Sequence, residues 1–445
     1  MIPMNRREFL RRSFVAAGGV SVAAPLLALA SCTDAVGPDD GEAGGGRRLQ
    51  GVGELTLPAG FSYRVLSREG EVMSDGSPTP TRFDGMGAFA GPAGATILIR
   101  NHENRGQPVE IGVRVPEDKR YDAHEDSNGG NTRLVVSADR RLVESHAVLG
   151  GTTRNCAGGT TPWGTWVTCE EEFDDGGMPH GYIFEVDASA TGPVDPAPIR
   201  SAGRLVHEAV AWDDGVLYAT EDRSDAAFYR VVFDTPPSAP GDLARAPGRL
   251  QALRIIGEEY FGVDTDKEWP VGTKFPVDWV TIGNPEPDDD DVRLQAHDLG
   301  AAVFSREEGA WAGNGRIYFD CTSGGRAGEG QVWEFDPRAQ ALTLIYESPG
   351  REQLHRPDNI VVGPTGDLFL CEDNDSGVHI RRLSPDGRIF EFARVTANES
   401  EFCGACFDPS GRTLFVNQQG DDDGTEAVTY AIWGPWHELG STKSL

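Results

Sequence analysis

The sequence has few basic side chains and no long unbroken hydrophobic run. Lysine and arginine number 40 against 70 aspartates and glutamates, which gives a formal net charge of −30. Without residues 1–31, which we interpret as a targeting segment, 36 basic and 69 acidic side chains remain. Such an acidic chain would repel the backbone of a nucleic acid, so we expect no nucleic-acid partner. The charge is compatible with binding of several divalent cations and also with simple solubility.

Several chemical motifs are also missing. Six cysteines follow Cys32, and their spacing is not that of a dense disulfide framework. Cys403 and Cys406 form a single CxxC pair without a second pair, which argues against a zinc ribbon and favours two buried thiols. No Walker-type loop and no Ser-His-Asp order occurs, so nothing indicates a nucleotide phosphate loop or a serine hydrolase of a common type.

The N-terminus carries an export pattern. Residues 6–10 read RREFL, a twin-arginine sequence, and a modest apolar stretch at 14–30 follows. Glycines and a proline interrupt this stretch, which is too short to be a membrane span. We expect export through the twin-arginine (Tat) machinery to the periplasm or cell envelope, with an ordinary secretory signal as the alternative.

A lipid anchor is expected directly after this segment. Leu29-Ala30-Ser31-Cys32 resembles a lipobox, in which Cys32 is lipidated and becomes the mature N-terminus; the alternative is a small-residue cleavage site. Residues 1–31 would then be a signal peptide and 32–52 a disordered tether rich in Gly, Asp and Glu. A lipid on Cys32 would be the only contact with a membrane. Because the Tat route carries folded proteins, iron loaded in the cytoplasm becomes plausible.

A weak internal repeat determines the expected fold. Each copy has a short run, a glycine turn, and an apolar strand that ends on a polar or acidic residue; the six copies are residues 91–103, 161–171, 212–222, 313–321, 363–373 and 408–419. Further strand candidates follow several copies, and no long helical periodicity appears. We therefore predict an all-β fold, a six-bladed β-propeller over residues 53–445. A pair of β-sandwiches is the alternative, although six similar units are hard to distribute over two sandwiches.

The intervals between the turns are uneven. The two longest imply inserted loops, at about 107–130 and 236–298. The second contains the acidic run Asp288–Asp291, which we interpret as a solvated loop, with calcium binding as the lesser alternative.

In a propeller the inner strands of all blades line one central channel, so equivalent residues converge. Metal-ligand types precede the turns, as in Asn155-Cys156, His207-Glu208 and Arg306-Glu307-Glu308, and acidic residues end the second strands. A single Asp or Glu near a strand end is more often a turn residue than a metal ligand. For His102 and His207, a structural role is favoured slightly over direct metal binding. Their recurrence, however, crowds carboxylates at one mouth, where only cations would neutralise them. The string RNCAGGTTPWGTWVTCEE (154–171) adds a thiolate, which suits iron, to carboxylates, which suit calcium.

With these units together, the chain resembles the PhoX-type alkaline phosphatases. The resemblance covers most of the mature chain and rests on NHEN (101–104), NCAGGTTPWGTWVTCEE (155–171), VHEA (206–209), TEDR (220–223), FSREEG (304–309), YFDCTSGG (318–325), RPDNIVVGPTGDLFLCED (356–373) and FDPSGRTLFVNQQ (407–419). It implies a propeller that holds two iron ions and several calcium ions and hydrolyses small-molecule phosphate esters.

The resemblance also implies roles for individual residues. Cys156 would be the thiolate ligand of iron, and Glu208, Glu308 and Asp358 would be carboxylate ligands of the iron–calcium cluster. Arg306 would hold the phosphate beside it. Further candidate calcium ligands are Glu103, Glu170, Glu171, Glu221, Asp222, Glu372 and Asp373.

Two other functions are compatible with this pattern. A calcium-dependent propeller lactonase would use carboxylates at the channel mouth without a thiolate. A lipid-anchored propeller without catalysis would keep the metals for stability and serve as a binding or scaffold protein. The chain departs from the PhoX-type family in one respect: the loops that would build the rim of the pocket look short.

Overall fold

The computed structural model describes residues 49–51, 54–173, 177–266, 269–373, 377–396, 398–421 and 424–439. One compact unit spans Gly45–Leu445. The expected signal peptide at 1–31 and Cys32 lie outside the described residues, so export and lipidation stay predictions. Within the described part of the chain, no helix is long and apolar enough to cross a membrane.

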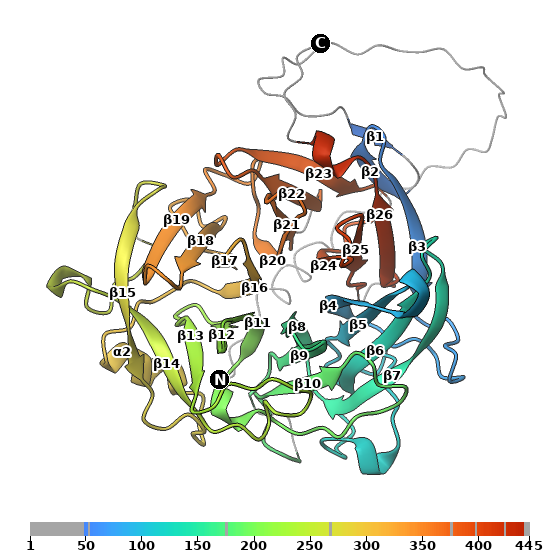
Figure 1. The fold of residues 1–445 in the computed structure, drawn as a ribbon, viewed down its shortest axis with the longest axis horizontal. Coiled ribbons are helices and arrows are strands. Elements are labelled where there is room, and N and C mark those ends of the chain that lie inside the picture. The colour runs from blue at the N-terminus through green and yellow to red at the C-terminus, as the bar shows by residue number, and fades with distance from the viewer. Residues whose placement is uncertain are drawn as a thin grey trace, which may run out of the picture. The chain divides into compact units, whose positions relative to one another are not determined.

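Antiparallel sheets surround a common centre (Figure 1). Two sheets start the ring: β4 (Phe83–Ala90), β5 (Thr96–His102), β6 (Gly129–Val136) and β7 (Leu142–Thr152), then β8 (Asn155–Thr160), β9 (Thr165–Glu170) and β10 (Ile183–Asp187). A nine-stranded sheet follows, with β11 (His207–Asp213), β12 (Val216–Glu221), β13 (Tyr229–Phe233), β14 (Gly248–Ile255), β15 (Lys274–Thr281), β19 (Ala341–Glu347), β18 (Gln331–Asp336), β17 (Arg316–Cys321) and β16 (Glu307–Gly313) in spatial order.

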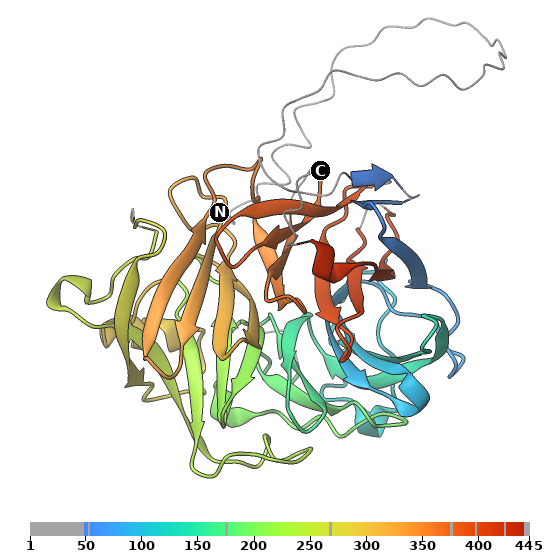
Figure 2. The same ribbon diagram turned by 45° about the horizontal axis from the view of Figure 1, so that its top comes forward.

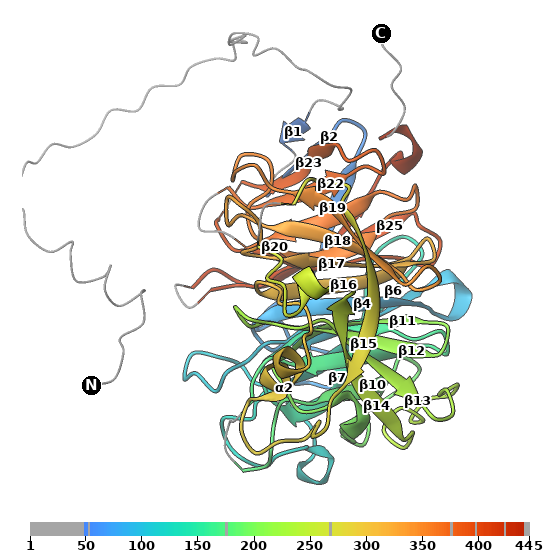
Figure 3. The same ribbon diagram turned by 90° about the vertical axis from the view of Figure 1, so that its left-hand side faces the viewer.

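The last two sheets combine strands from both ends of the chain. One contains β1 (Leu49–Gly51), β2 (Leu55–Pro58), β23 (Ile389–Val395), β22 (His379–Leu383), β21 (Leu368–Glu372) and β20 (Pro357–Val362). The other contains β24 (Phe402–Phe407), β25 (Thr413–Gln418), β26 (Val428–Trp433) and β3 (Ser62–Arg68). The N-terminal strand β3 thus pairs antiparallel with the C-terminal β26 and closes the ring, as the blue and red strands in Figure 2 show. The strands β1 and β2 extend the neighbouring sheet beside β23 (Figure 3).

Helical structure is limited to short pieces between strands. The described residues contain one α-helix, α2 (Val292–Asp298), and 3₁₀ turns at Pro92–Gly94, Glu117–Lys119, Arg200–Ala202, Glu258–Tyr260 and Trp436–Glu438. The all-β propeller is confirmed, and the two-sandwich alternative is excluded. In the described residues, six inner hairpins occupy the ring; in chain order they are β4–β5, β8–β9, β11–β12, β16–β17, β20–β21 and β24–β25. The third and fourth hairpins belong to one nine-stranded sheet, so six separate blades stay a prediction.

Two boundaries differ from expectation. The segment 236–298, expected as an inserted loop, contains β14 and β15, which extend the sheet beyond β13 and pair it with β19. Both strands were missed because the repeated unit of a glycine-turn hairpin and a third strand does not include them. Residues Leu49–Gly51 of the expected tether pair with β2, and the rest of that tether lies outside the described residues.

Burial follows the position of a strand in its sheet. Every residue of β9 and β25 is buried, because these second strands pack between neighbouring sheets. The outer β13 alternates buried and half-buried residues, as a strand with one wetter face does. Buried aromatic rings such as Phe228, Phe319 and Trp333 fill the space between the third and fourth hairpins. This packing fixes the inner strands, and with them the side chains at the centre.

Candidate metal centre

Each inner strand begins with the same irregularity. The pairing register shifts after Phe83, Asn155, His207, Glu307 and Pro357, and near Cys403 in the sixth hairpin. Such a shift is a β-bulge, which bends the strand and redirects a side chain. We call the six residues at this place the bulge residues: Asp84, Cys156, Glu208, Glu308, Asp358 and Cys403.

A second set of equivalent residues directly follows the second strand of each hairpin. We call them the end residues: Glu103, Glu171, Asp222, Thr322, Asp373 and Gln419. In every hairpin the end residue donates its backbone N–H to the carbonyl two residues before the bulge residue, at 2.8–3.2 Å. The carbonyls belong to the lead residues: Arg82, Arg154, Val206, Arg306, Arg356 and Glu401. One backbone hydrogen bond, repeated six times, therefore holds both sets of side chains at the same end of the ring.

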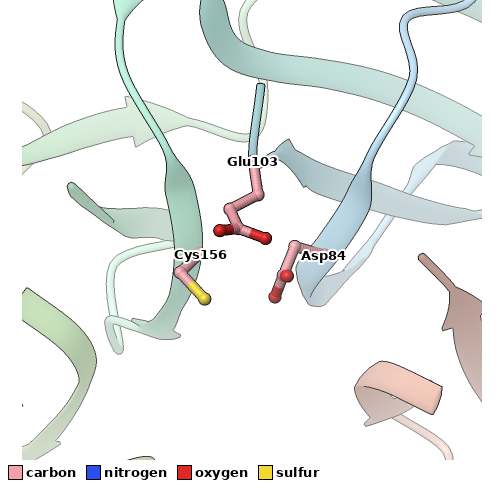
Figure 4. Close-up of side chains that lie close together, drawn as sticks. All are labelled: Asp84, Glu103 and Cys156. Atoms are coloured by element: carbon pink, nitrogen blue, oxygen red, sulfur yellow. The ribbon is translucent and has the colours of Figure 1, made fainter. Parts of the chain in front are cut away.

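These positions bring ligand-type atoms together. Three groups have ligand atoms that all lie within 4.8 Å of one another: Asp84, Glu103 and Cys156; Cys156, Glu171 and Glu208; and Glu208, Glu308 and Asp358. The carboxylates of Asp84 and Glu103 and the sulfur of Cys156 point toward one space in Figure 4. Because Cys156 belongs to two groups and Glu208 to two, the groups form one continuous centre rather than three separate sites.

The centre holds more acidic groups than its arginines neutralise. Burial, and then the neighbouring carboxylates, raise the pKa of Asp84, Glu208 and Glu308 well above the ordinary range. Burial followed by Asp373 raises the pKa of Asp358 to about 8. Burial also raises the pKa of the Cys156 thiol, and Asp84 and Glu208 add to this. These directions describe the protein without cations, in which the carboxylates take up protons to avoid repulsion.

Arginines occupy one part of the rim. Arg306 donates two hydrogen bonds of 2.8 Å to Asp222 and one of 2.7 Å to Glu308. Arg154 donates to Glu103 at 3.1 Å and to Glu171 at 2.6 Å, and Arg105 pairs with Glu103 as well. Burial alone would raise the pKa of Glu103, but Arg105 and Arg154 outweigh it and lower the value to about 2.

Small residues close the ring beneath the centre. Gly85, Ala157, Ala209 and Gly309 directly follow bulge residues and line a cavity of only about 10 Å³. A Cβ atom on Gly85 would lie 2.5 Å from Cα of Ala157, and one on Gly309 would lie 2.7 Å from the backbone nitrogen of Ile360. A side chain at either place would force neighbouring hairpins apart. The centre is therefore closed on the side of these small residues.

The structure separates the adjacent acidic pairs that the sequence offered. Successive side chains of a strand point to opposite faces, so only one member of each pair reaches the centre. Glu170 accepts hydrogen bonds from His180 and from the backbone of Thr153, Gly181 and Tyr182. Glu372 binds Arg381 and His379, and Glu221 accepts from Tyr229. The structure thus places Glu170, Glu221 and Glu372 inside the sheets, apart from the three groups.

The other expected residues lie at the centre. Cys156, Glu208, Glu308, Asp358, Glu103 and Glu171 belong to the three groups, while Asp222 holds Arg306 and Asp373 adjoins Asp358. Whether each one binds a metal stays a prediction. Asp84 was missed, as were Arg154 and Arg105, whereas Glu401 was expected among the ligand-type residues before the last turn. The repeat itself carried the signal for Asp84, because Phe83-Asp84-Gly85 precedes the first turn as Asn155-Cys156-Ala157 precedes the second.

The side chains present fit iron and calcium. Glu208 is 0% exposed, and no hydrogen bond from a nitrogen or hydroxyl donor reaches either of its carboxylate oxygens in the described residues. A buried carboxylate left in this way is strongly destabilising unless it is protonated or binds a cation. The mixture of one thiol and several carboxylates suits a transition metal beside hard cations.

The adjacent residues Glu170 and Glu171 provide a matched test of which acidic side chains face the metal centre and which lie inside the sheets. We expect Glu171→Gln to lower the number of bound metal ions per protein and to change the melting temperature little once metal is absent. Glu170→Gln should lower the melting temperature with or without metal, because an amide cannot accept from His180 and three backbone N–H groups together. Elemental analysis and thermal melting of both variants check this. Equal metal loss in the two variants would contradict the assignment of faces.

Metal removal should make the stability of the folded protein decrease as pH rises from about 4 to about 8. Asp358 has an ordinary pKa of 3.8 and a folded value of about 8 without metal, so the folded state binds the extra proton between these values. The unfolding free energy of the metal-free protein therefore falls as pH rises through this interval. Bound cations take the place of the protons and remove the decrease. Melting curves at pH 5 and pH 8, with and without a chelator, measure this; identical pH dependence in both samples would refute it.

Comparisons with known proteins agree with this geometry. Residues 46–422 match the family of alkaline phosphatase PhoX. PhoX of Pseudomonas fluorescens, solved in complex with vanadate, a transition state analogue, has a similar fold: the TM-score is 0.66 at 17% identity, covering 87% of this chain and 97% of that chain. A gluconolactonase of Xanthomonas campestris gives a TM-score of 0.41 at 12% identity, covering 87% of this chain and 99% of that one. No curated protein sequence matches. Because the family match spans most of the chain, this protein belongs to the PhoX family of alkaline phosphatases, as its motifs predicted.

Proposed function

We propose that this phosphatase hydrolyses small-molecule phosphate esters at a centre of iron and calcium ions formed by the bulge and end residues. The observation that carries the proposal is the continuity of the three ligand groups through Cys156 and Glu208. Ligands shared in this way favour a multinuclear centre over isolated ions. Iron would bind at Cys156, whose thiolate suits a transition metal, and calcium among the carboxylates.

The ions, when bound, supply Lewis-acid stabilisation of the phosphate oxygens and a nucleophile at moderate pH. The chain contributes the remaining parts. Asp222 and Glu308 hold the Arg306 guanidinium at the edge of the centre, where 38% of its side chain is exposed. From this place Arg306 can donate to phosphate oxygens and offset their charge during transfer. Arg154, fixed by Glu103 and Glu171, adds positive charge to the same part of the rim.

Two neighbouring buried thiols allow a matched test of the iron site. We expect Cys156→Ala to lose iron and at least about a hundredfold of its turnover of p-nitrophenyl phosphate, since one direct metal ligand is removed. Cys169→Ala, on the adjacent strand β9 and outside the three groups, should keep both. Elemental analysis and steady-state kinetics measure the two quantities.

Two outcomes would contradict this assignment. Full iron content and undiminished hydrolysis in Cys156→Ala would remove Cys156 from the site. Calcium without iron in the wild-type protein would sink the iron–calcium proposal and favour calcium-dependent lactone hydrolysis instead.

We also propose that the chain is exported by the Tat pathway and anchored through a lipid on Cys32. The twin arginines and the lipobox-like sequence support this. Replacement of Arg6 and Arg7 by lysine should retain the protein in the cytoplasm, and Cys32→Ala should move the exported protein from the membrane to the soluble envelope fraction. Unchanged fractionation of both variants would contradict the proposal.

A further inference from the structure

Four of the six lead residues are arginines in a left-handed backbone conformation. The φ angles are 52° for Arg82, 43° for Arg154, 55° for Arg306 and 53° for Arg356. Residues other than glycine, asparagine and aspartate occupy this region at an energetic disadvantage. The chain uses glycine freely elsewhere, with 56 in total. Retention of arginine at four equivalent strained positions therefore indicates a requirement for the side chain.

Three of these arginines have the same kind of partner. Each reaches back to the end residue of the preceding hairpin: Arg82 to the amide oxygen of Gln419 at 3.5 Å, Arg154 to Glu103 at 3.1 Å, and Arg306 to Asp222 at 2.8 Å. The repeated geometry thus pairs a guanidinium on one hairpin with a side-chain oxygen on the hairpin before it. In two of the three cases that oxygen belongs to a carboxylate.

Arg356 stands at the equivalent place without such a partner. The end residue of the preceding hairpin is Thr322, whose short hydroxyl carries no charge. The Arg356 side chain is exposed, and its guanidinium forms no hydrogen bond or ion pair with any residue that the structure describes. Its backbone is nevertheless fixed: the N–H donates to the carbonyl of Glu329, and the carbonyl accepts from Asp373, both at 2.9 Å. Among the described residues, no side-chain contact accounts for an arginine in this strained conformation.

We propose that Arg356 and Thr322 form an anion subsite beside the metal centre, which binds a second phosphate group of the substrate. The proposal rests on the proposed function and names the substrate class: phosphate esters that carry a further phosphate. Asp358, a bulge residue of the centre, is only two residues from Arg356, so a substrate phosphate at the centre brings its neighbouring groups to this part of the rim. A guanidinium binds two phosphate oxygens at once, and Thr322, only 1% exposed, places no carboxylate against it. In a chain with a net charge of −30, such a local cation offsets the repulsion of a polyanionic substrate.

The test compares two substrates that differ in the second phosphate. The ratio of kcat/KM for adenosine triphosphate to that for p-nitrophenyl phosphate is measured for the wild type and for Arg356→Gln. We expect the ratio to fall about tenfold, the loss expected for one charge-assisted contact. Arg351→Gln is the control, since Arg351 is exposed on the same connection between β19 and β20, outside the lead positions, and pairs with Glu329 at 3.4 Å. It should leave the ratio unchanged.

A second pair of variants fills the subsite from within. Thr322→Asp places a carboxylate opposite Arg356, as Arg154 and Arg306 have opposite them. The new carboxylate should pair with the Arg356 guanidinium and so lower the ratio as Arg356→Gln does. Thr322→Asn has a similar size and no charge and should keep the ratio within about twofold. An unchanged ratio in Arg356→Gln, or an equal loss for both substrates, would overturn the subsite.

A binding measurement separates failure of this inference from failure of the proposed function. If the metal-replete wild type hydrolyses neither substrate, the proposed function fails, and the subsite is still tested by calorimetric titration with inorganic pyrophosphate. We expect the affinity for pyrophosphate to fall about tenfold in Arg356→Gln and to change much less for inorganic phosphate. Equal affinity of the wild type and Arg356→Gln for pyrophosphate would overturn the subsite independently of turnover.

Discussion

The crowding of buried acidic groups around Glu208 is the constraint on which the rest of the structure depends. Glu208 has carboxylate or thiol groups on both sides and no contact with solvent, and in the described residues no nitrogen or hydroxyl donor reaches either of its oxygens. A chain that only had to fold would not retain this arrangement, because the desolvation of each charge opposes folding. The arrangement is stable only when protons or cations neutralise it. The propeller holds these side chains close together in spite of the repulsion between their charges.

The propeller frame depends on a few structural features that recur in every hairpin rather than on a single hydrophobic core. The bulge turns a side chain inward, and the backbone hydrogen bond from the end residue to the lead residue fixes where the second strand stops. Side chains then connect neighbouring hairpins: Asn101 donates to the carbonyls of Cys156 and Ala157, and Asn417 donates to the carbonyl of Asp84. Ring closure by β3 and β26 couples the two ends of the chain to the same frame. Loss of closure would therefore disturb Asp84, although β3 contributes no ligand.

The sequence predicted the repeat and the convergence at one mouth, because both follow from periodic glycine turns and from propeller geometry. It did not predict which member of each acidic pair reaches the centre. Glu170 and Glu171 are chemically alike, and only the strand register, with Glu170 opposite Asn155, assigns one to the interior and the other to the centre. Asp84 was missed although its position obeys the repeat, because a single aspartate before a glycine is also typical of a turn. The strands β14 and β15 were missed because they lie outside the repeated unit of a glycine-turn hairpin and a third strand; they join the third and fourth hairpins into one sheet.

Equivalent positions nevertheless differ in chemistry, and hydrogen-bond partners decide the difference. Cys156 and Cys403 are both bulge residues and both buried thiols. The Cys403 sulfur donates to the carbonyl of Phe83 at 3.0 Å and so ties the sixth hairpin to the first. The Cys156 sulfur belongs instead to two groups of carboxylates. The same comparison separates Arg306, held by two carboxylates, from Arg356, whose counterpart is a threonine. In this fold, the residues that are alike in all hairpins form the scaffold. The hairpins that differ in residue type or in hydrogen-bond partner are the ones that give the site its chemistry.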